Sequence, residues 1–222
     1  DYLGVKTTLN NRFVAENSEF LLFAVKPKKF DEVAKELEGV RPEKVISVMD
    51  VLTKNHIKNS LGVGLIKVAR CVPNLPCEIG SGAIGLDMSD FNKSSDDCDF
   101  ISSVFNTLGT VVSVEESKLA AANGVSCGGA ACTFMFIDSL IEAGVHEGLT
   151  KNEAKILAVQ TVLGCAEMVQ REENSVEELT LLACNKGGAS AGTVKALEEK
   201  GLRGAVGSAV EACATRLKGQ NN

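Results

Sequence analysis

The sequence predicts an α/β region in residues 1–114, followed by an all-α region in residues 115–222. Two observations support this division. Before Glu115, short apolar runs alternate with helical patterns, which is typical of a parallel sheet covered by helices. After Glu115, only helical patterns with capping signals remain.

The strands of the predicted sheet are short apolar runs that end at turn residues. Phe30 to Leu37, between two of these runs, has apolar residues along one stripe and predicts a helix. Because strand and helix signals alternate, we expect the strands to run parallel. The predicted strands are Glu19–Val25, Lys44–Val48, Gly64–Cys71, Gly82–Leu86 and Thr110–Val114.

The second region predicts a small set of helices, one of them unusually apolar. Gly129 to Ala143 is apolar around most of its circumference, which is typical of a buried helix. Capping boxes at Thr150 and Ser175 predict two further helix starts. Because so few helices cannot cover the apolar one, we expect a homodimer or higher homo-oligomer. The remaining predicted helices are Ala189–Glu199 and Gly204–Lys218.

Composition argues against several classes of partner. The net charge is -6, there are 23 Lys and Arg and no Trp, so nucleic-acid binding is not expected. Leu119 to Ile137 is uncharged, but its polar and glycine residues argue against a membrane span. Eight cysteines without a Cys-x-x-Cys pair predict free thiols in a reducing cytoplasm and no metal site.

Three segments could bind a ligand. Ala24-Val25-Lys26-Pro27 ends a buried strand, where parallel sheets place ligands, although taken alone a plain strand end stopped by Pro is the better explanation. Ser126 to Ala131 and Lys186 to Ser190 each put a glycine pair before a predicted helix. A helix start offers free amides to an anion, whereas tight turns between packed helices are the alternative.

Taken in order, these segments resemble the pyrroline-5-carboxylate reductase family from about Val5 to Arg216. The resemblance implies a partial Rossmann-type parallel sheet followed by a helical dimerisation domain. It also implies NAD(P)H-dependent reduction of the C=N bond of Δ1-pyrroline-5-carboxylate to L-proline, in proline biosynthesis. The matching motifs are Val25-Lys26-Pro27, Arg70 to Pro76, Ser126 to Ala131, Asp138 to Leu149, Gly187 to Ser190 and Leu197 to Arg203.

The resemblance assigns roles to individual residues. Ser190 is the predicted catalytic residue, with a hydroxyl that would hydrogen-bond the substrate carboxylate. The cofactor would be NADP or NAD. The predicted cofactor-binding residues are Asn11, Ala24, Val25, Lys26, Pro27 and Asn74. The predicted substrate-binding residues are Ser126, Gly128, Gly129, Glu173, Gly188, Ala189 and Ser190.

The chain departs from the family pattern mainly on the cofactor side. The N-terminal Gly-x-Gly-x-x-Gly element has no counterpart, so a β-α-β unit of about 30 residues or more is missing and we expect weak NAD(P)H binding. Met49-Asp50-Val51-Leu52 replaces Ala-Ala-Gly-Val and adds a carboxylate near a polyanionic cofactor. On the substrate side, Cys127-Gly128 replaces Gly-Ser, Ala130 replaces Pro and Leu182 replaces a common Asn.

Two other functions stay open at this point. One is a noncatalytic reductase-like dimer that binds a small amino or imino acid. The other is a Rossmann-type dehydrogenase of hydroxy acids, which typically has a catalytic Lys on a central helix. Leu157 to Gln170 contains no Lys, and this makes the hydroxy-acid dehydrogenase the weakest of the three hypotheses.

Overall fold

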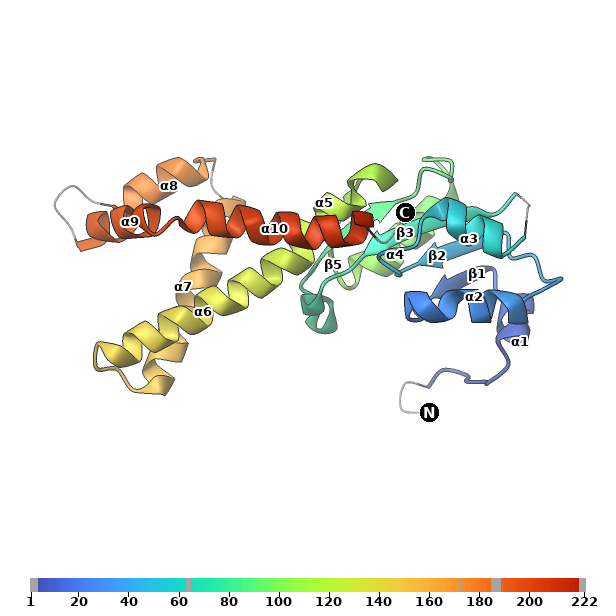
Figure 1. The fold of residues 1–222 in the computed structure, drawn as a ribbon, viewed down its shortest axis with the longest axis horizontal. Helices are drawn as coiled ribbons and strands as arrows, with labels where there is room; N and C mark the ends of the chain where they lie inside the picture. Colours follow the sequence, from blue (N-terminus) through green and yellow to red (C-terminus); the bar gives the residue numbers. More distant parts are fainter. Residues whose placement is uncertain (1–3, 63–64, 172, 185–188, 220–222) are drawn as a thin grey trace. The chain divides into compact units, whose positions relative to one another are not determined.

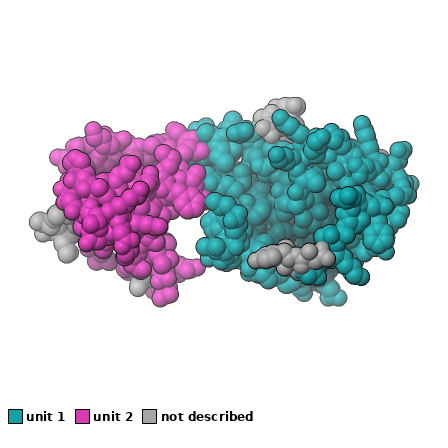
Figure 2. All heavy atoms as spheres, turned by 90° about the horizontal axis from the view of Figure 1, so that it is seen from below, with its two compact units in different colours: residues 1–128, 210–222 teal, residues 129–209 magenta. Residues whose placement is uncertain are grey.

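The computed structural model describes residues 4–62, 65–171, 173–184 and 189–219 (Figure 1). The chain forms two compact units (Figure 2). The first comprises residues 1–128 and 210–222, and the second comprises residues 129–209. These limits differ from the predicted division after residue 114, because the first helix beyond it packs on the sheet. The predicted division into functional domains stays a prediction.

The first unit is built on a five-stranded sheet of described residues, in the order β1-β2-β3-β4-β5. β1 pairs parallel with β2, and β2 pairs parallel with β3. All five predicted strands are confirmed, each with slightly different ends. The strands are β1 Phe20–Phe23, β2 Lys44–Ser47, β3 Lys67–Val72, β4 Gly82–Asp87 and β5 Gly109–Ser113.

The expectation of an entirely parallel sheet is wrong at one place. β4 runs antiparallel to β3, while β5 runs parallel to β4. Residues 73–81 join β3 to β4 and contain the short 3-10 helix η1, Leu75–Ile79. A connection this short cannot return the chain to the far end of the sheet, as a parallel crossover of a dozen or more residues must.

Helices pack on both faces of this sheet, which explains why most residues of its inner strands are apolar. On one face, Phe30 and Ile57 pack against Val45 and Val68. On the other face, a second cluster includes Ile101 together with strand residues that alternate with the first set. The covering helices are α2 Pro27–Glu36 and α3 Lys54–Ser60 on the first face, and α4 Asp96–Asn106 on the second.

Four helices among the described residues of the first unit were not predicted: α1 Asn11–Glu16, α3, α4 and α5 Leu119–Asn123. The start of α4 carried a signal that the sequence analysis missed. Ser95 precedes three acidic residues, and its hydroxyl accepts a hydrogen bond from the Cys98 amide. An N-cap serine followed by carboxylates in the first turn favours a helix start over the loop that the polar composition suggests.

One continuous helix of described residues runs from Glu116 to His146. It consists of η2 Glu116–Lys118, α5 Leu119–Asn123, a π-helical stretch η3 Gly124–Gly128 and α6 Gly129–His146. α5 crosses the sheet closely at Gly85, where a Cβ atom would come within 2.8 Å of the Ala122 Cβ. Within the first unit, residue 210 of α10 (Leu202–Gly219) packs on Gly124.

The second unit contains α6, α7 Lys151–Arg171, α8 Val176–Ala183, α9 Ala189–Glu199 and the start of α10. Both predicted capping boxes are confirmed. Glu153 accepts hydrogen bonds from the Thr150 amide and hydroxyl, and the Ser175–Glu178 pair is reciprocal. α6 and α7 form a hairpin, and Gly144 lets Ala154 approach its backbone closely.

The prediction of a buried helix at Gly129 to Ala143 is wrong for the single chain. α6, which is described throughout, has no buried residue. Phe134, Met135 and Phe136 are 53%, 73% and 42% exposed. Among the described residues, Glu116–His146 is also the helical stretch long and apolar enough to cross a membrane by length and composition alone. An apolar helix that is covered on only one side is equally typical of a subunit interface.

Candidate functional site

The carboxyl ends of β1, β2 and β3 lie at one edge of the sheet because these strands are parallel. Residues 24–27, 48–50 and 73–74 follow the three strands in turn. β4 begins at the same edge because it runs antiparallel to β3. Ligands of open parallel sheets bind at this edge, so it is the first place to look for a site.

The segment after β1 holds four of the predicted cofactor residues together. Ala24 and Lys26 are exposed, while Val25 packs partly against the core. Pro27 is the first residue of α2, and no side chain caps the described start of this helix. The segment therefore offers an accessible helix N-terminus beside the strand end, an arrangement that suits a phosphate or another anion.

The segment after β2 contains Met49-Asp50-Val51-Leu52, which departs from the family pattern, and the structure shows where its larger side chains lie. Met49 is 2% exposed and belongs to the core, and Val51 is also buried. Within residues 49–52, only Asp50 is exposed. The larger side chains of Met49 and Val51 therefore do not project from the edge. The Asp50 carboxylate remains as the one group that repels an anionic ligand.

Asn74, after β3, connects three parts of the first unit. Its carboxamide oxygen accepts a hydrogen bond from the Ala83 amide, 2.9 Å away, at the start of β4. Its Nδ2 donates to the carbonyl oxygen of Ser126, 3.2 Å away, in the π-helical stretch. The predicted substrate residue Ser126 is therefore tied to the same edge as residues 24–27.

The thiol of Cys127 makes a second connection at this place. Its Sγ donates to the Pro73 carbonyl oxygen at 3.4 Å. Burial raises the pKa of Cys127, a hydrogen bond from Ser126 opposes this, and nearby Cys213, Asp50 and Cys77 raise it further. Since the net direction is upward, the group is a protonated thiol at neutral pH and can act as the donor in this contact.

The helix start predicted at the Gly128-Gly129 pair is wrong. Both residues lie inside the continuous Glu116–His146 helix, and Gly128 ends the π-helical stretch. Glycine lowers helix propensity by about 1 kcal/mol, so the pair resembled a loop. Packing of α5 on the sheet and of Gly124 against α10 overrides that local preference. A π-helical turn within an α-helix is itself frequent at functional sites.

Arg70 and Glu116 form an ion pair behind this edge that the sequence analysis did not assign. The Arg70 side chain is 5% exposed, and its NH1 lies 2.8 Å from Glu116 Oε1. Arg70 NH2 also donates to the Asp50 carbonyl oxygen, and Glu116 accepts from the Lys54 amide. These contacts fix the backbone after β2 and the start of the long helix relative to β3. The signal was a lone Arg inside an apolar strand, since buried charges need partners.

Asn11 lies apart from the other predicted cofactor residues. Its Nδ2 donates to Glu36 Oε2, 2.8 Å away, at the C-terminal end of α2. α2 starts at the carboxyl edge and returns the chain toward the amino end of β2. The structure therefore places Asn11 beside the opposite end of α2 from Pro27.

A Gly-x-Gly-x-x-Gly pattern does occur in the chain, at Gly80 to Gly85, although none of the sequence-based predictions used it. It leads from η1 into β4, whereas a dinucleotide-binding fingerprint leads from a strand into a helix. A Cβ at Gly82 would collide with the Cys77 side chain and lie 2.9 Å from the Leu108 carbonyl oxygen. These glycines therefore permit close packing of β4, and they do not form a phosphate loop.

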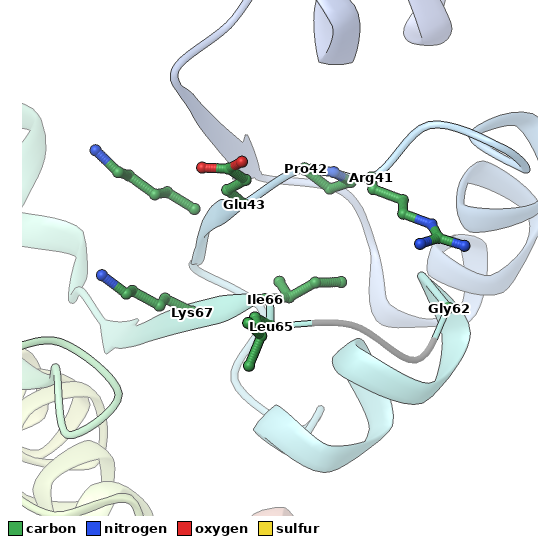
Figure 3. Close-up of a pocket in the computed structure, with 8 residues that line it drawn as sticks. Arg41, Pro42, Glu43, Gly62, Leu65, Ile66 and Lys67 are labelled. Atoms are coloured by element: carbon green, nitrogen blue, oxygen red, sulfur yellow. The ribbon is translucent and has the colours of Figure 1, made fainter.

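The hollow at the opposite edge of the sheet is not a convincing site. It has a volume of about 590 Å³ and lies at the amino ends of β2 and β3 (Figure 3). The side chains of Arg41 and Lys67 extend away from one another there (Figure 3). Polar groups that do not converge cannot define a ligand. Among the described residues, no group of three or more His, Cys, Asp and Glu is arranged to hold a metal.

Comparison with known proteins relates both units of the chain to one protein family. The family model described as pyrroline-5-carboxylate reductase dimerisation matches residues 116–220. The pyrroline-5-carboxylate reductase of Synechocystis sp. is 32% identical over 221 residues, which cover 97% of this chain and 82% of that protein. The chain belongs to the pyrroline-5-carboxylate reductase family. The reductase of Aquifex aeolicus is 29% identical over 97% of this chain and 80% of its own length.

Solved structures of the family share the fold. The reductase of Coxiella burnetii has a TM-score of 0.88 at 32% identity, covering 100% of this chain and 83% of that one. The Plasmodium falciparum pyrroline carboxylate reductase, solved with NADP bound, has a TM-score of 0.87 at 28% identity. This second match covers 97% of this chain and 82% of that chain. The predicted fold, a Rossmann-type sheet with a helical dimerisation domain, is confirmed.

The remaining substrate residues predicted by the family resemblance belong to the second unit. Gly129 begins α6, and Glu173 is an exposed residue shortly after α7. Ala189 and Ser190 open α9, but their side chains are outside what the structure describes. Gly188 lies outside the described residues altogether. Within the first unit alone, Ser126 and Gly128 are the predicted substrate residues at the sheet edge, and the individual site assignments stay predictions.

Proposed function

We propose that this chain catalyses the NAD(P)H-dependent reduction of Δ1-pyrroline-5-carboxylate to L-proline. One observation carries the proposal beyond family membership. Three motifs that are far apart in the sequence lie at the same edge of the sheet in the first unit: Val25 to Pro27, Asn74, and Ser126 to Gly128, which Asn74 contacts through Ser126. The substrate and cofactor segments of a reductase must lie together in this way, because hydride transfer requires the two reactants in contact.

The residues of this edge fit one part of a dinucleotide. Residues 24–27 present an uncapped helix start and a partly buried valine, and they would face the cofactor, NADP or NAD. When bound, the cofactor supplies the hydride for the C=N carbon, while the imine nitrogen takes a proton. The exposed carboxylate of Asp50 at the same edge repels the phosphates of the cofactor, so it is expected to weaken NAD(P)H binding.

The protein's own task is to hold the small acid in place. Ser190 would donate its hydroxyl to the substrate carboxylate, supported by the neighbouring Gly188 and Ala189. The start of α9 is suited to binding a carboxylate, because the first amides of a helix lack helical partners and the helix dipole favours negative charge there. Glu173 is proposed to lie at the substrate as well. The small amino or imino acid class follows from these short polar contacts.

The active form is proposed to be a homodimer joined through the second unit. Its apolar helices are exposed in the single chain, and the matching family model describes dimerisation. The same helices would then be covered by the partner subunit and not by lipid. A cytoplasmic location, with no nucleic-acid and no membrane partner, completes the proposal and agrees with the acidic composition.

The test is a turnover assay on the purified 222-residue chain. NADPH at concentrations up to millimolar, to allow for weak binding, is mixed with Δ1-pyrroline-5-carboxylate, and its oxidation is followed by absorbance. Mass spectrometry should detect L-proline only when both reactants are present. Absence of turnover, with the fold and the dimer intact, would contradict the proposal.

A specific observation favours one alternative, a noncatalytic dimer that binds a small amino or imino acid. Asp50 is exposed at the edge where a polyanionic cofactor would lie. Titration calorimetry separates the two functions. The alternative predicts proline binding without measurable NADPH binding or turnover, whereas the reductase binds both.

A further inference from the structure

We propose that Asn74 is a positioning residue, which holds the π-helical stretch Gly124–Gly128 against the carboxyl edge of the sheet and thereby sets the backbone of the substrate segment. The role of that segment rests on the proposed function. The hydrogen bonds themselves are a property of the first unit and can be tested without turnover.

The carboxamide of Asn74 is used at both ends. The oxygen accepts from the Ala83 amide at 2.9 Å, and the nitrogen donates to the Ser126 carbonyl at 3.2 Å. Ala83 lies in β4 and Ser126 in η3, so one side chain joins a strand to a helix. A carboxamide offers an acceptor and a donor on the same short planar group, and this explains why Asn can form both contacts.

The π-helical stretch needs such a contact. A π turn widens the helix and departs from the regular α-helical hydrogen-bond ladder, so it persists only where surrounding contacts hold it. Residues 73–74 form two hydrogen bonds with this stretch, one as the donor and one as the acceptor. Asn74 donates to the Ser126 carbonyl, and Cys127 donates to the Pro73 carbonyl at 3.4 Å. The start of the stretch is fixed as well, because Gly124 packs on residue 210 of α10.

This arrangement changes the role expected for Asn74. The sequence predicted a cofactor ligand, but the structure uses both ends of the carboxamide inside the chain. Asn74 then acts through Ser126 and Gly128, whose backbone it locates relative to residues 24–27. Reactants displaced by about 1 Å can lose about 100-fold in rate, so a tie that fixes this separation matters for turnover.

Two substitutions separate the two ends of the carboxamide. Asn74→Asp keeps the oxygen that accepts from Ala83 and removes the donor to Ser126, whereas Asn74→Ala removes both. Asn17→Ala is the matched control, because Asn17 Nδ2 also donates to a backbone carbonyl, that of Phe13 at 2.8 Å, but at the end of α1. Hydrogen exchange is measured by mass spectrometry on the wild-type chain and all three variants.

Asn74→Asp should speed exchange of the amides in residues 124–130 by about tenfold, with the Ala83 amide still protected. Asn74→Ala should also release Ala83, and Asn17→Ala should change neither region. Wild-type exchange at residues 124–130 in the Asp variant would overturn the proposal, because Ser126 would then not depend on the donor.

Kinetics distinguish positioning from stability alone. Asn74→Asp should raise the KM for Δ1-pyrroline-5-carboxylate by about tenfold and leave the KM for NADPH unchanged. Faster exchange and a lower melting temperature with an unchanged substrate KM would reduce Asn74 to a structural residue and overturn the positioning role. If the wild-type chain has no turnover, the proposed function fails; proline affinity by calorimetry on the same variants then decides the positioning role in its place.

Discussion

The two units differ in how much of their apolar surface they cover by themselves. In the first unit, helices bury both faces of the sheet, and residues such as Phe30, Val45 and Ile101 are completely buried. In the second unit, the buried residues among those described are Ala154 and Ala158 on α7. The first unit thus has its own core, whereas the second exposes large apolar side chains that an isolated soluble domain rarely shows.

The reason lies in the geometry of the second unit. A helical hairpin such as α6 and α7 covers only the facing side of each helix, and Gly144 against Ala154 uses small residues there. The larger residues point elsewhere. A groove of about 570 Å³ between α7, α8 and α9 is lined mainly by apolar side chains, among them Met168, Leu179 and Val194. The comparison predicts that stability depends on protein concentration in the second unit and not in the first.

The largest effect is expected from a change to the core of the first unit. Phe30→Ala removes a completely buried ring that packs edge-to-face on Phe23, with 5.1 Å between centroids. It should lower the free energy of unfolding by about 3 to 5 kcal/mol. Urea denaturation at two protein concentrations should give the same loss. A loss that grows on dilution would contradict the independence of this core. Leu9→Ala, at a fully exposed position, is the control.

The second effect concerns the exposed face of α6. Met135→Glu places a carboxylate where we propose the partner subunit packs, since Met135 is 73% exposed in the single chain. The dimer dissociation constant should rise about 100-fold, which corresponds to about 2.7 kcal/mol. Sedimentation equilibrium measures it, and Leu9→Glu is the control. A wild-type chain that is monomeric at low micromolar concentration, with its fold intact, would refute the proposed dimer.

The third effect tests the anion site that the sequence places in the second unit. Ser190→Ala should weaken proline binding by about 1 to 3 kcal/mol, the contribution of one hydrogen bond to a charged group. If Ser190 only caps α9, the variant should lose about 1 kcal/mol of stability and keep its affinity. Melting temperature and calorimetric affinity measured on one sample decide between these outcomes, with Ser94→Ala in an exposed turn as the control.

The smallest effect is a pH dependence at the start of α8. The Ser175 amide, followed by its hydroxyl, lowers the pKa of Glu178 by hydrogen bonding to the carboxylate. A lowered folded pKa means that the stabilisation is present above the ordinary pKa of Glu, about 4.3, and is lost as pH falls through the folded pKa. Glu178→Gln should flatten the melting temperature between pH 6 and pH 3, whereas Glu177→Gln in the same turn should not.

Local patterns predicted much of the second unit and of the sheet. Thr150 with Glu153, and Ser175 with Glu178, predicted two helix starts because a capping box is satisfied by residues three apart. The apolar runs predicted all five strands. Local patterns failed where distant contacts decide the outcome. Gly128-Gly129 predicted a loop, yet packing of α5 on Gly85 continues the helix through it.

The sequence by itself determined the strands, the capped helices, the motifs that identify the family and the apolar character of α6. Each depends on neighbouring residues or on the composition of one segment. Only the tertiary structure decided the direction of β4, the burial of Met49 beside an exposed Asp50, and the meeting of Asn74 with Ser126. These depend on which distant segments become neighbours, and side-chain hydrogen bonds such as those of Asn74 exist only after the chain has brought their partners within about 3 Å.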